Sequence, residues 1–194
     1  MIIKGKRVSL RAIELSDLGL LHQWANDPAI TVGLGDIHFP SSVSQQEKWF
    51  ERIQNDNNNL RLAIQYGDDK LIGYTGYWNV HWKDRRAEHA LVIGDVEYHG
   101  RGVGREVILA AARYAFEELD FHRLDATVID FNAASLKCYL SCGFQIEGRL
   151  REHANRGGKR FDRIMLGLLS RNYFSLISES KYWELPVEED ENQQ

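Results

Sequence analysis

The sequence predicts a single α+β domain, and three observations support this fold class. Segments of alternating hydrophobicity fill the middle of the chain, a glycine-rich loop then leads into a segment with helical spacing, and two more alternating segments complete the pattern. The 194 residues are enough for one domain with a sizeable core, and no repeat or proline-, glycine- or serine-rich linker divides them. We therefore expect one domain over residues 1–183 and an acidic, disordered tail over residues 184–194.

The first half of the chain carries signals for two helices and four strands. Ser16-Asp17 is a helix N-cap signal, and the Asn26-Asp27-Pro28 run should end that helix. Gly67-Asp68-Asp69 lies between two alternating segments and predicts a hairpin within an antiparallel meander. The expected elements are a strand over Val8–Ile13, a helix from Ser16 to Asn26, a loop over Ala29–Val43, a helix from Ser44 to Ile53, and strands over Leu60–Tyr66, Leu71–Val80 and Ala87–Ile93.

The second half changes character and predicts helix, strand, helix and hairpin. Val103, Val107, Ala110 and Tyr114 recur at helical spacing, and the segment 123–129 alternates again. The remaining expected elements are a helix capped by Asn132 and ended by Gly143, and strands over Phe144–His153 and Arg160–Leu169. The apolar side chains of residues 173–183 should dock on the domain itself or on a second copy in a homodimer.

Composition excludes several classes of protein. The formal net charge is -4, whereas a nucleic-acid-binding protein would carry a basic excess. We expect a cytoplasmic protein without a membrane segment, because no apolar run approaches the roughly 20 residues that span a bilayer and the N-terminal residues lack a signal-peptide pattern. We expect no metal, because Cys138 and Cys142 lack partners at zinc-site spacing.

A glycine-rich loop is the first chemical signal. It reads Tyr98-His99-Gly100-Arg101-Gly102-Val103-Gly104-Arg105 and joins an expected strand to an expected helix. Alternate glycines let the backbone turn tightly and leave its N–H groups uncovered, and a helix N-terminus concentrates such donors where they bind a phosphate. Two arginines add positive charge. The loop residues His99, Gly100, Arg101, Gly102, Val103, Gly104 and Arg105 are therefore candidates to bind a phosphorylated ligand, with a purely structural turn as the alternative.

Two better-known glycine loops do not fit this segment. A Walker loop ends in Gly-Lys-Ser/Thr, which is absent. The dinucleotide fingerprint requires a glycine where Arg105 stands, and no parallel βαβ pattern precedes the loop. A nucleotide-binding regulatory module therefore has no support beyond the glycines.

The second chemical signal lies at the start of the following helix. Asn132 and Ser135 occupy its N-cap and N3 positions, and Tyr139 comes two turns after the cap on the same side. Together with Gly143 and Phe144 they match in full the motif Asn-x-x-Ser/Ala-x-x-x-Tyr-x-x-x-Gly-Phe. Each residue alone is explained by capping or packing, but the pattern combined with the glycine loop is specific.

With both motifs, the chain resembles the GCN5-related N-acetyltransferase (GNAT) family over residues 8–169. His99 stands where the family's loop motif has Arg or Gln. Three further pieces, Val8–Arg11, Arg85–Glu88 and Glu147-Gly148, look like the branch that acetylates ribosomal-protein N-termini and equally like the spermidine acetyltransferases.

The resemblance implies a mixed, mostly antiparallel central sheet flanked by helices, with the coenzyme site at splayed middle strands. It implies acetyl-CoA as cosubstrate. The glycine loop would hold the pyrophosphate, and Tyr139 would protonate the departing thiolate. Further coenzyme contacts would come from Val92 and Ile93 at a strand end, and from Asn132 and Ser135.

The acceptor implied by the resemblance is a primary amine that attacks directly within a ternary complex. It could be a protein N-terminus or a small molecule such as spermidine, an amino sugar or an antibiotic. Glu88 is the first candidate for the base, with an ion pair to Arg85 or Arg86 as the alternative reading, and His81 and His89 are further candidates. A catalytically inactive acyl-CoA sensor is the rival of another class.

Side chains near the acceptor can also be named. The candidates for the pocket lining are Trp24, Asp27, Trp49, Trp78, His81 and Trp82, and the carboxylates available for a polyamine are Asp27, Asp36, Glu47 and Glu51.

Overall fold

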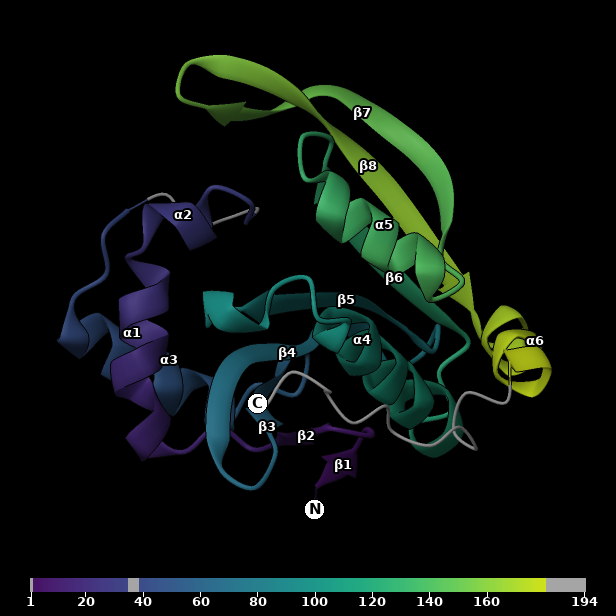
Figure 1. Cartoon of the computed structure of the whole chain (residues 1–194), viewed down its shortest axis with the longest axis horizontal. Coiled ribbons are helices and arrows are strands. Elements are labelled where there is room, and N and C mark those ends of the chain that lie inside the picture. The colour runs from purple at the N-terminus through teal and green to yellow at the C-terminus, as the bar shows by residue number, and fades with distance from the viewer. Residues whose placement is uncertain (1, 35–38, 181–194) are drawn as a thin grey trace, which may run out of the picture.

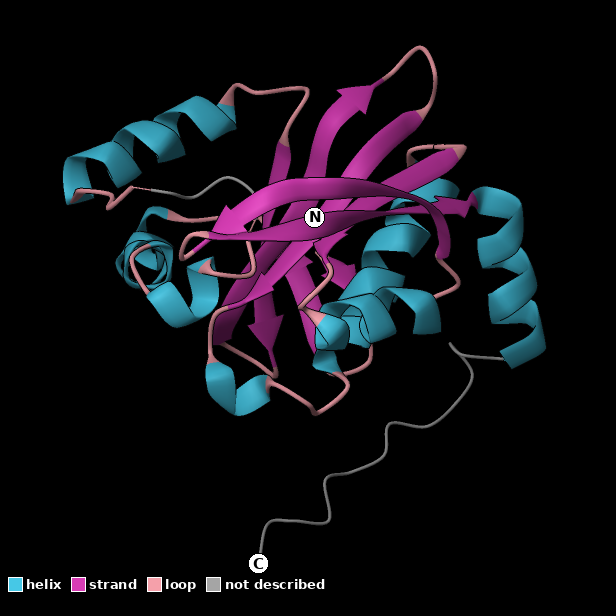
Figure 2. Ribbon diagram, turned by 90° about the horizontal axis from the view of Figure 1, so that it is seen from above, coloured by secondary structure: helices cyan, strands magenta, loops and turns pink. Residues whose placement is uncertain are grey.

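The computed structural model describes residues 2–34 and 39–180. They form one mixed eight-stranded sheet with helices on both faces (Figures 1 and 2). The strand order is β1-β2-β3-β4-β5-β6-β8-β7. The strands are β1 (Ile3–Lys4), β2 (Val8–Arg11), β3 (Leu60–Tyr66), β4 (Lys70–His81), β5 (Arg86–Ile93), β6 (Arg123–Ile129), β7 (Gln145–Arg156) and β8 (Lys159–Leu169).

All neighbouring strands are antiparallel except β5 and β6, which are parallel. This is the mixed, mostly antiparallel α+β sheet that the sequence predicts. The helices are α1 (Leu18–Ala25), α2 (Pro28–Thr31), α3 (Val43–Gln54), α4 (Val103–Arg113), α5 (Ala133–Ser141) and α6 (Ser170–Ser180). Short 3-10 turns, η1 (Leu15–Asp17) and η2 (Val96–Tyr98), precede α1 and α4, and a π-helical turn, η3 (Tyr114–Glu118), follows α4.

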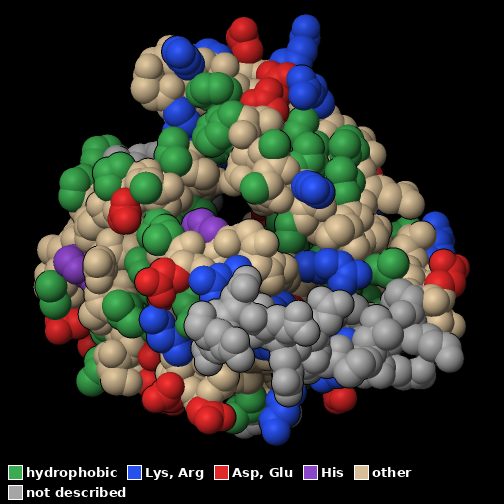
Figure 3. Space-filling model, viewed as in Figure 1, with side chains coloured by type: hydrophobic (Ala, Val, Ile, Leu, Met, Phe, Trp, Pro, Cys, Tyr) green, Lys and Arg blue, Asp and Glu red, His purple; other side chains and the backbone are tan. Residues whose placement is uncertain are grey.

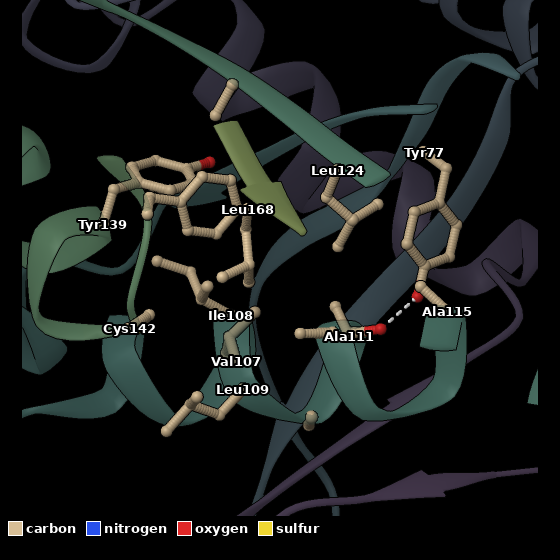
Figure 4. Close-up of a cluster of buried hydrophobic side chains, with 14 of the residues drawn as sticks. Tyr77, Val107, Ile108, Leu109, Ala111, Ala115, Leu124, Tyr139, Cys142 and Leu168 are labelled. Atoms are coloured by element: carbon tan, nitrogen blue, oxygen red, sulfur yellow. Dashed lines mark hydrogen bonds between the residues drawn. The ribbon is translucent and has the colours of Figure 1, made fainter. Parts of the chain in front are cut away.

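The larger core lies on the sheet face that α4, α5 and α6 cover. Helix α4 presents a run of small and branched apolar residues to the sheet, and Tyr77 donates a hydrogen bond of 2.6 Å from its hydroxyl to the Ala111 carbonyl (Figure 4). A smaller core lies on the opposite face, under α1 and α3, around Leu21, Trp24 and Ala63. The sheet therefore separates the two hydrophobic cores.

The predicted loop over Ala29–Val43 is wrong at its beginning, where the short helix α2 forms. Asp27 accepts a hydrogen bond of 2.8 Å from the Ala29 N–H, and Pro28 occupies the first helical turn. Both are helix-starting features, so the Asn26-Asp27-Pro28 run ends one helix and begins the next.

The end of the described chain folds back as α6. Tyr173 is fully buried, packs on Phe116 and donates a hydrogen bond of 3.1 Å to Glu117, while Leu176 and Ile177 pack on the larger core. Docking on the chain's own domain therefore accounts for these residues, and a homodimer stays a prediction. Tyr182, Trp183 and the acidic tail lie outside the described residues. Within the described part, no helix is both long and apolar enough to span a membrane.

Candidate active site

The middle of the sheet opens where β5 and β6 stop pairing. Arg86, Ala87 and Glu88 pair with residues 123–125, but β5 continues to Ile93 and β6 to Ile129 without further pairing between them. This edge of β5 therefore carries backbone groups that no neighbouring strand satisfies, and such an edge can pair with amide groups of a ligand. Figure 3, in the orientation of Figure 1, shows the surface hollowed between α2, α5 and β5.

Tyr139 reaches this opening from α5. Its side chain is 4% exposed, and its hydroxyl lies 3.1 Å from Nδ1 of His89 and 3.3 Å from the His89 carbonyl oxygen. His89 is itself 1% exposed, and its Nε2 lies 3.0 Å from the hydroxyl of Thr75. Thr75 donates to the Ala90 carbonyl at 2.8 Å, so its oxygen must accept from His89 Nε2–H. The Nδ1 lone pair and the carbonyl oxygen of His89 then both lie within reach of the single Tyr139 hydroxyl proton, and Nδ1 is the nearer acceptor.

Burial determines the protonation states of His89 and Tyr139. Desolvation lowers the pKa of His89 to about 3, so the imidazole is neutral at physiological pH. Desolvation also raises the pKa of Tyr139 well above its usual value, so its hydroxyl keeps its proton. His89 is therefore an oriented hydrogen-bond acceptor for Tyr139. It lies on the α4–α5 face of the sheet, which argues against its role as the base for the acceptor.

Glu88 precedes His89 on β5, so its side chain points to the other face of the sheet. It lies where β5 and β6 separate. Thr127 on β6 donates a hydrogen bond of 3.2 Å to one carboxylate oxygen, and the Asn79 amide lies 3.4 Å from the other. The alternative reading, an ion pair with Arg85 or Arg86, is wrong. Arg85 pairs with Asp120, and Arg86 lies 4.0 Å and 3.9 Å from carboxylate oxygens of Asp84 and Asp125.

The glycine-rich loop forms the N-terminus of α4. Gly100 and Gly102 have φ values of 75° and 74°, in the left-handed region that favours glycine, and Gly102 is the N-cap residue. The first backbone N–H groups of α4, on Val103 and Gly104, have no acceptor within the helix because no helical turn precedes them. With the positive end of the helix dipole they provide the donors that a pyrophosphate requires.

His99 does not point into this loop. Its Nε2 lies 2.8 Å from the carbonyl oxygen of Ile93, so the ring connects the end of β5 to the loop. Asn132 caps α5 and accepts a hydrogen bond of 3.1 Å from the Ser135 N–H. Its amide nitrogen also lies 3.1 Å from where a side chain on Gly33 would begin, so the segment after α2 packs against the start of α5.

Comparison with known proteins identifies the fold and its chemistry. The family model described as "Acetyltransferase (GNAT) domain" matches residues 7–145. This chain belongs to the GNAT acetyltransferases. The uncharacterized N-acetyltransferase p20 of Bacillus licheniformis is 30% identical over 173 residues, which cover 87% of this chain and 96% of that protein. Acetyl-CoA is the cosubstrate of this acetyltransferase, as the resemblance predicts.

Two of the relatives whose names state an acceptor belong to the branches that the sequence resembles. The spermidine N-acetyltransferase from Vibrio cholerae, solved in complex with CoA and spermine, has a TM-score of 0.81 and 27% identity, with coverage of 87% of this chain and 98% of that one. The putative ribosomal N-acetyltransferase YdaF of Bacillus subtilis is 28% identical over 118 residues, which cover 61% of this chain and 63% of that protein. The similar proteins therefore include members of both GNAT branches that the sequence resembles.

A brace beneath the coenzyme loop of this acetyltransferase was missed at the sequence level. Glu106 is 3% exposed and accepts hydrogen bonds from the backbone N–H groups of Arg7 and Val8. The Arg7 side chain pairs with Glu106 at 3.1 Å and donates to the Arg101 carbonyl at 3.2 Å. The bond to Arg101 ties the segment before β2 to the glycine-rich loop. The only sequence signal for this brace is a glutamate within the apolar run of α4.

The aromatic residues predicted to line the acceptor pocket divide into several environments. Trp24 is buried, and its ring lies 2.1 Å from where a side chain on Gly94 would begin, so it packs flat on the end of β5. Trp49 packs in the smaller core. Trp82 is 44% exposed and donates to the Asn57 carbonyl, away from the opening. Trp78 pairs with Glu88 across β4 and β5 and lies on the acceptor face, 3.6 Å beneath the Arg61 guanidinium.

Among the residues that the structure describes, the predicted polar lining does not gather into an anionic pocket. His81 is exposed and pairs with Asp84 at 2.9 Å. Asp27 caps α2, and Glu47 and Glu51 are exposed on α3. Asp36 lies outside the described residues. Within residues 2–34 and 39–180, no three His, Cys, Asp or Glu side chains form a group that could hold a metal ion.

The β7–β8 hairpin encloses the acceptor side. Arg156, at the end of β7, donates from Nε to the Val32 carbonyl at 2.9 Å and also bonds to the Leu34 carbonyl. The segment 32–34 therefore touches the hairpin at one point and the start of α5, through Gly33 and Asn132, at another. These contacts join the segment after α2 to the hairpin and to α5, and they bound the hollow on this side. We call this bounded hollow the entrance.

Proposed function

We propose that this enzyme transfers the acetyl group to a primary amine by direct attack within a ternary complex. One observation carries the proposal: the parallel pairing of β5 and β6 ends at Glu88, with the Tyr139 hydroxyl on one face of the opening and the Glu88 carboxylate on the other. A thioester placed in the opening would have a proton donor on its sulfur side and a proton acceptor on its amine side.

The coenzyme side of the proposed site combines three elements. The N-terminus of α4, from Gly102 to Arg105, binds the pyrophosphate through backbone N–H groups, and the positive charges of Arg101 and Arg105 attract it. The edge of β5 at Val92 and Ile93, which does not pair with β6, hydrogen-bonds the amides of the pantetheine arm through groups other than the Ile93 carbonyl, which contacts His99. Asn132 and Ser135 at the start of α5 contact the coenzyme beside it.

The reaction forms one bond and breaks another. The neutral amine nitrogen attacks the thioester carbon, and the tetrahedral intermediate is stabilised by a backbone N–H of the β5 edge, an effect of about 3–4 kcal/mol in other enzymes. The nitrogen loses its proton to Glu88. The carbon–sulfur bond then breaks, and Tyr139 donates its proton to the sulfur. A thiol pKa near 8.5 makes this proton useful but not indispensable.

The bounded entrance favours an amine carried on a slender molecule. We favour a small-molecule amine over a protein N-terminus, because the matched spermidine N-acetyltransferase is covered along 98% of its length and YdaF along 63%. An extended protein N-terminus could also pass the entrance and stays the second candidate. The cytoplasmic location and a homodimer also stay predictions.

An acceptor screen tests the proposal. Acetyl-CoA is mixed with L-amino acids and their amides, polyamines, amino sugars, aminoglycosides and short peptides with free N-termini, and free thiol and acetylated product are both measured. We expect amine-dependent thiol release with matching N-acetylated product, and initial-rate lines that intersect when both substrates are varied. Parallel lines would indicate a covalent acetyl-enzyme and contradict direct attack. Tight acetyl-CoA binding without acetylation of any amine would favour the acyl-CoA sensor.

A further inference from the structure

Arg163 on β8 has an unusual environment. Its Nε is buried, and no hydrogen-bond acceptor lies within reach of it among the described residues. The neighbouring positions on its face of the sheet are apolar: Ile129 is its partner on β6, Leu150 is its partner on β7, and Phe161 and Met165 flank it on β8. A guanidinium keeps its charge under all ordinary conditions, so a buried donor without a partner is costly.

Three other arginines on this half of the sheet have acceptors. Arg123 pairs with Asp125 and Glu147, Arg149 pairs with Asp162 at 2.8 Å, and Arg156 bonds to backbone carbonyls. Arg163 makes no ion pair within the described part of the chain. The fold does not require an unpaired donor at this position, because an apolar residue in place of Arg163 would remove it.

The register places Arg163 on the acceptor face. Thr127, whose hydroxyl contacts Glu88, is paired with Met165, and Arg163 comes two residues further along β8. With about 3.4 Å per residue along a strand and about 4.8 Å between strands, the Cα atoms of Thr127 and Arg163 are about 8 Å apart. A long side chain can reach over this distance toward the ligand that Glu88 faces.

The coenzyme phosphates do not provide the missing acceptor. The glycine loop and Tyr139 belong to the face covered by α4 and α5, whereas Thr127, Glu88 and Arg163 lie on the opposite face. An anion bound by Arg163 would therefore belong to the acceptor. The planar guanidinium matches a carboxylate in geometry and charge, and such charge-assisted pairs are stronger than neutral hydrogen bonds, above all away from water.

We infer that Arg163 binds a carboxylate of the acceptor, and that the acceptor is therefore a small amine that also carries a carboxylate, of the free amino-acid class. This inference rests on the proposed function. It assigns the amine to Glu88 and the carboxylate to Arg163, so that the two groups orient the substrate. It also agrees with the scattered positions of Asp27, Glu47 and Glu51, the predicted carboxylates that the structure describes.

The test compares L-amino acids with their amides, which have the same side chain and amine but no carboxylate. The ratio of kcat/KM for acid and amide is measured in the wild type, in Arg163→Met and in Arg160→Gln. Arg160 is exposed on the alternate face of β8 and loses the same charge from the same strand. The ratio within one variant is independent of the fraction of active enzyme, and turnover of the amide shows that the variant is folded.

We expect the wild type and Arg160→Gln to prefer the acid by at least tenfold, and Arg163→Met to bring the ratio close to one through a loss on the acid alone. Loss of a charge-assisted hydrogen bond corresponds to a factor of about 10 to 100. An equal ratio in the wild type and Arg163→Met, or turnover restricted to amines without a carboxylate, would overturn the inference and leave the acetyltransferase function intact. No turnover with any amine would overturn the proposed function and this inference with it.

Discussion

Replacement of Tyr139 by phenylalanine separates the chemistry of this residue from its packing. The ring of Tyr139 packs on Phe144, and phenylalanine keeps that ring, so the change removes only the hydroxyl. The hydroxyl is the donor for Nδ1 of His89, which is buried. Leaving that acceptor unsatisfied should lower the free energy of unfolding by about 1–3 kcal/mol.

The same substitution should also slow the reaction. A positioned general acid contributes about 10²–10⁴-fold to rate, and the lower end applies because thiolate is a good leaving group. We expect kcat of Tyr139→Phe to fall about 100-fold, equivalent to about 2.7 kcal/mol, while the KM for acetyl-CoA stays within about threefold.

The assay is steady-state thiol release with single-turnover measurements to establish that chemistry limits the rate. Tyr173→Phe is the matched control, because it also loses a buried hydroxyl, which donates to Glu117 at the α6 side of the core. It should lose stability but keep kcat. An unchanged kcat in Tyr139→Phe under rate-limiting chemistry would remove Tyr139 from the mechanism.

Three further predictions follow from the same geometry. The pKa of His89 falls from 6.5 to about 3 on folding, so its contribution to stability is complete above pH 6.5 and is lost as the pH falls. Between pH 6 and 4, the free energy of unfolding of the wild type should fall by about 1.4 kcal/mol per pH unit more than that of His89→Gln. Equal slopes of the two proteins in denaturant titrations would contradict this. Gly102→Ala, at a φ of 74°, should raise the KM for acetyl-CoA at least tenfold, while Gly157→Ala, at a φ of 55° in the turn between β7 and β8, should not; equal KM values would argue against the loop as the pyrophosphate site. Glu106→Gln keeps an oxygen for the backbone N–H groups of Arg7 and Val8 but removes the charge and places an amide NH2 against the Arg7 Nε–H, so it should lower the free energy of unfolding by about 3 kcal/mol; a loss below about 1 kcal/mol in urea titrations would refute the brace.

Sequence periodicity predicted most of the elements because hydrophobic alternation and helix caps are local. The strand over Arg123–Ile129 has the predicted bounds, and the cap by Asn132 forms as expected. The sequence does not predict helix α2, because Asp27-Pro28 fits the end of one helix as well as the start of the next. Strand β1 is only two residues long and has no periodic signal.

The sequence predicts those parts of the candidate site that belong to a sequence motif. The glycine loop and Tyr139 have such motifs, and the structure places them on the same face of the sheet as His89. Pairings between distant residues, such as Arg7 with Glu106, depend on sheet order and register, which sequence spacing does not contain. Arg163 could not be singled out among the many arginines until its neighbours on three strands were known.

The central claim is that the thioester lies between Tyr139 and Glu88, and the pH dependence of kcat at saturating acceptor tests it most directly. Wild type is compared with Glu88→Gln and with Glu51→Gln, an exposed glutamate on α3. The account predicts that kcat of Glu88→Gln falls about 100-fold and that its acidic limb is lost or shifted, while Glu51→Gln behaves as wild type. An unchanged kcat with an unshifted acidic limb in Glu88→Gln would contradict the account.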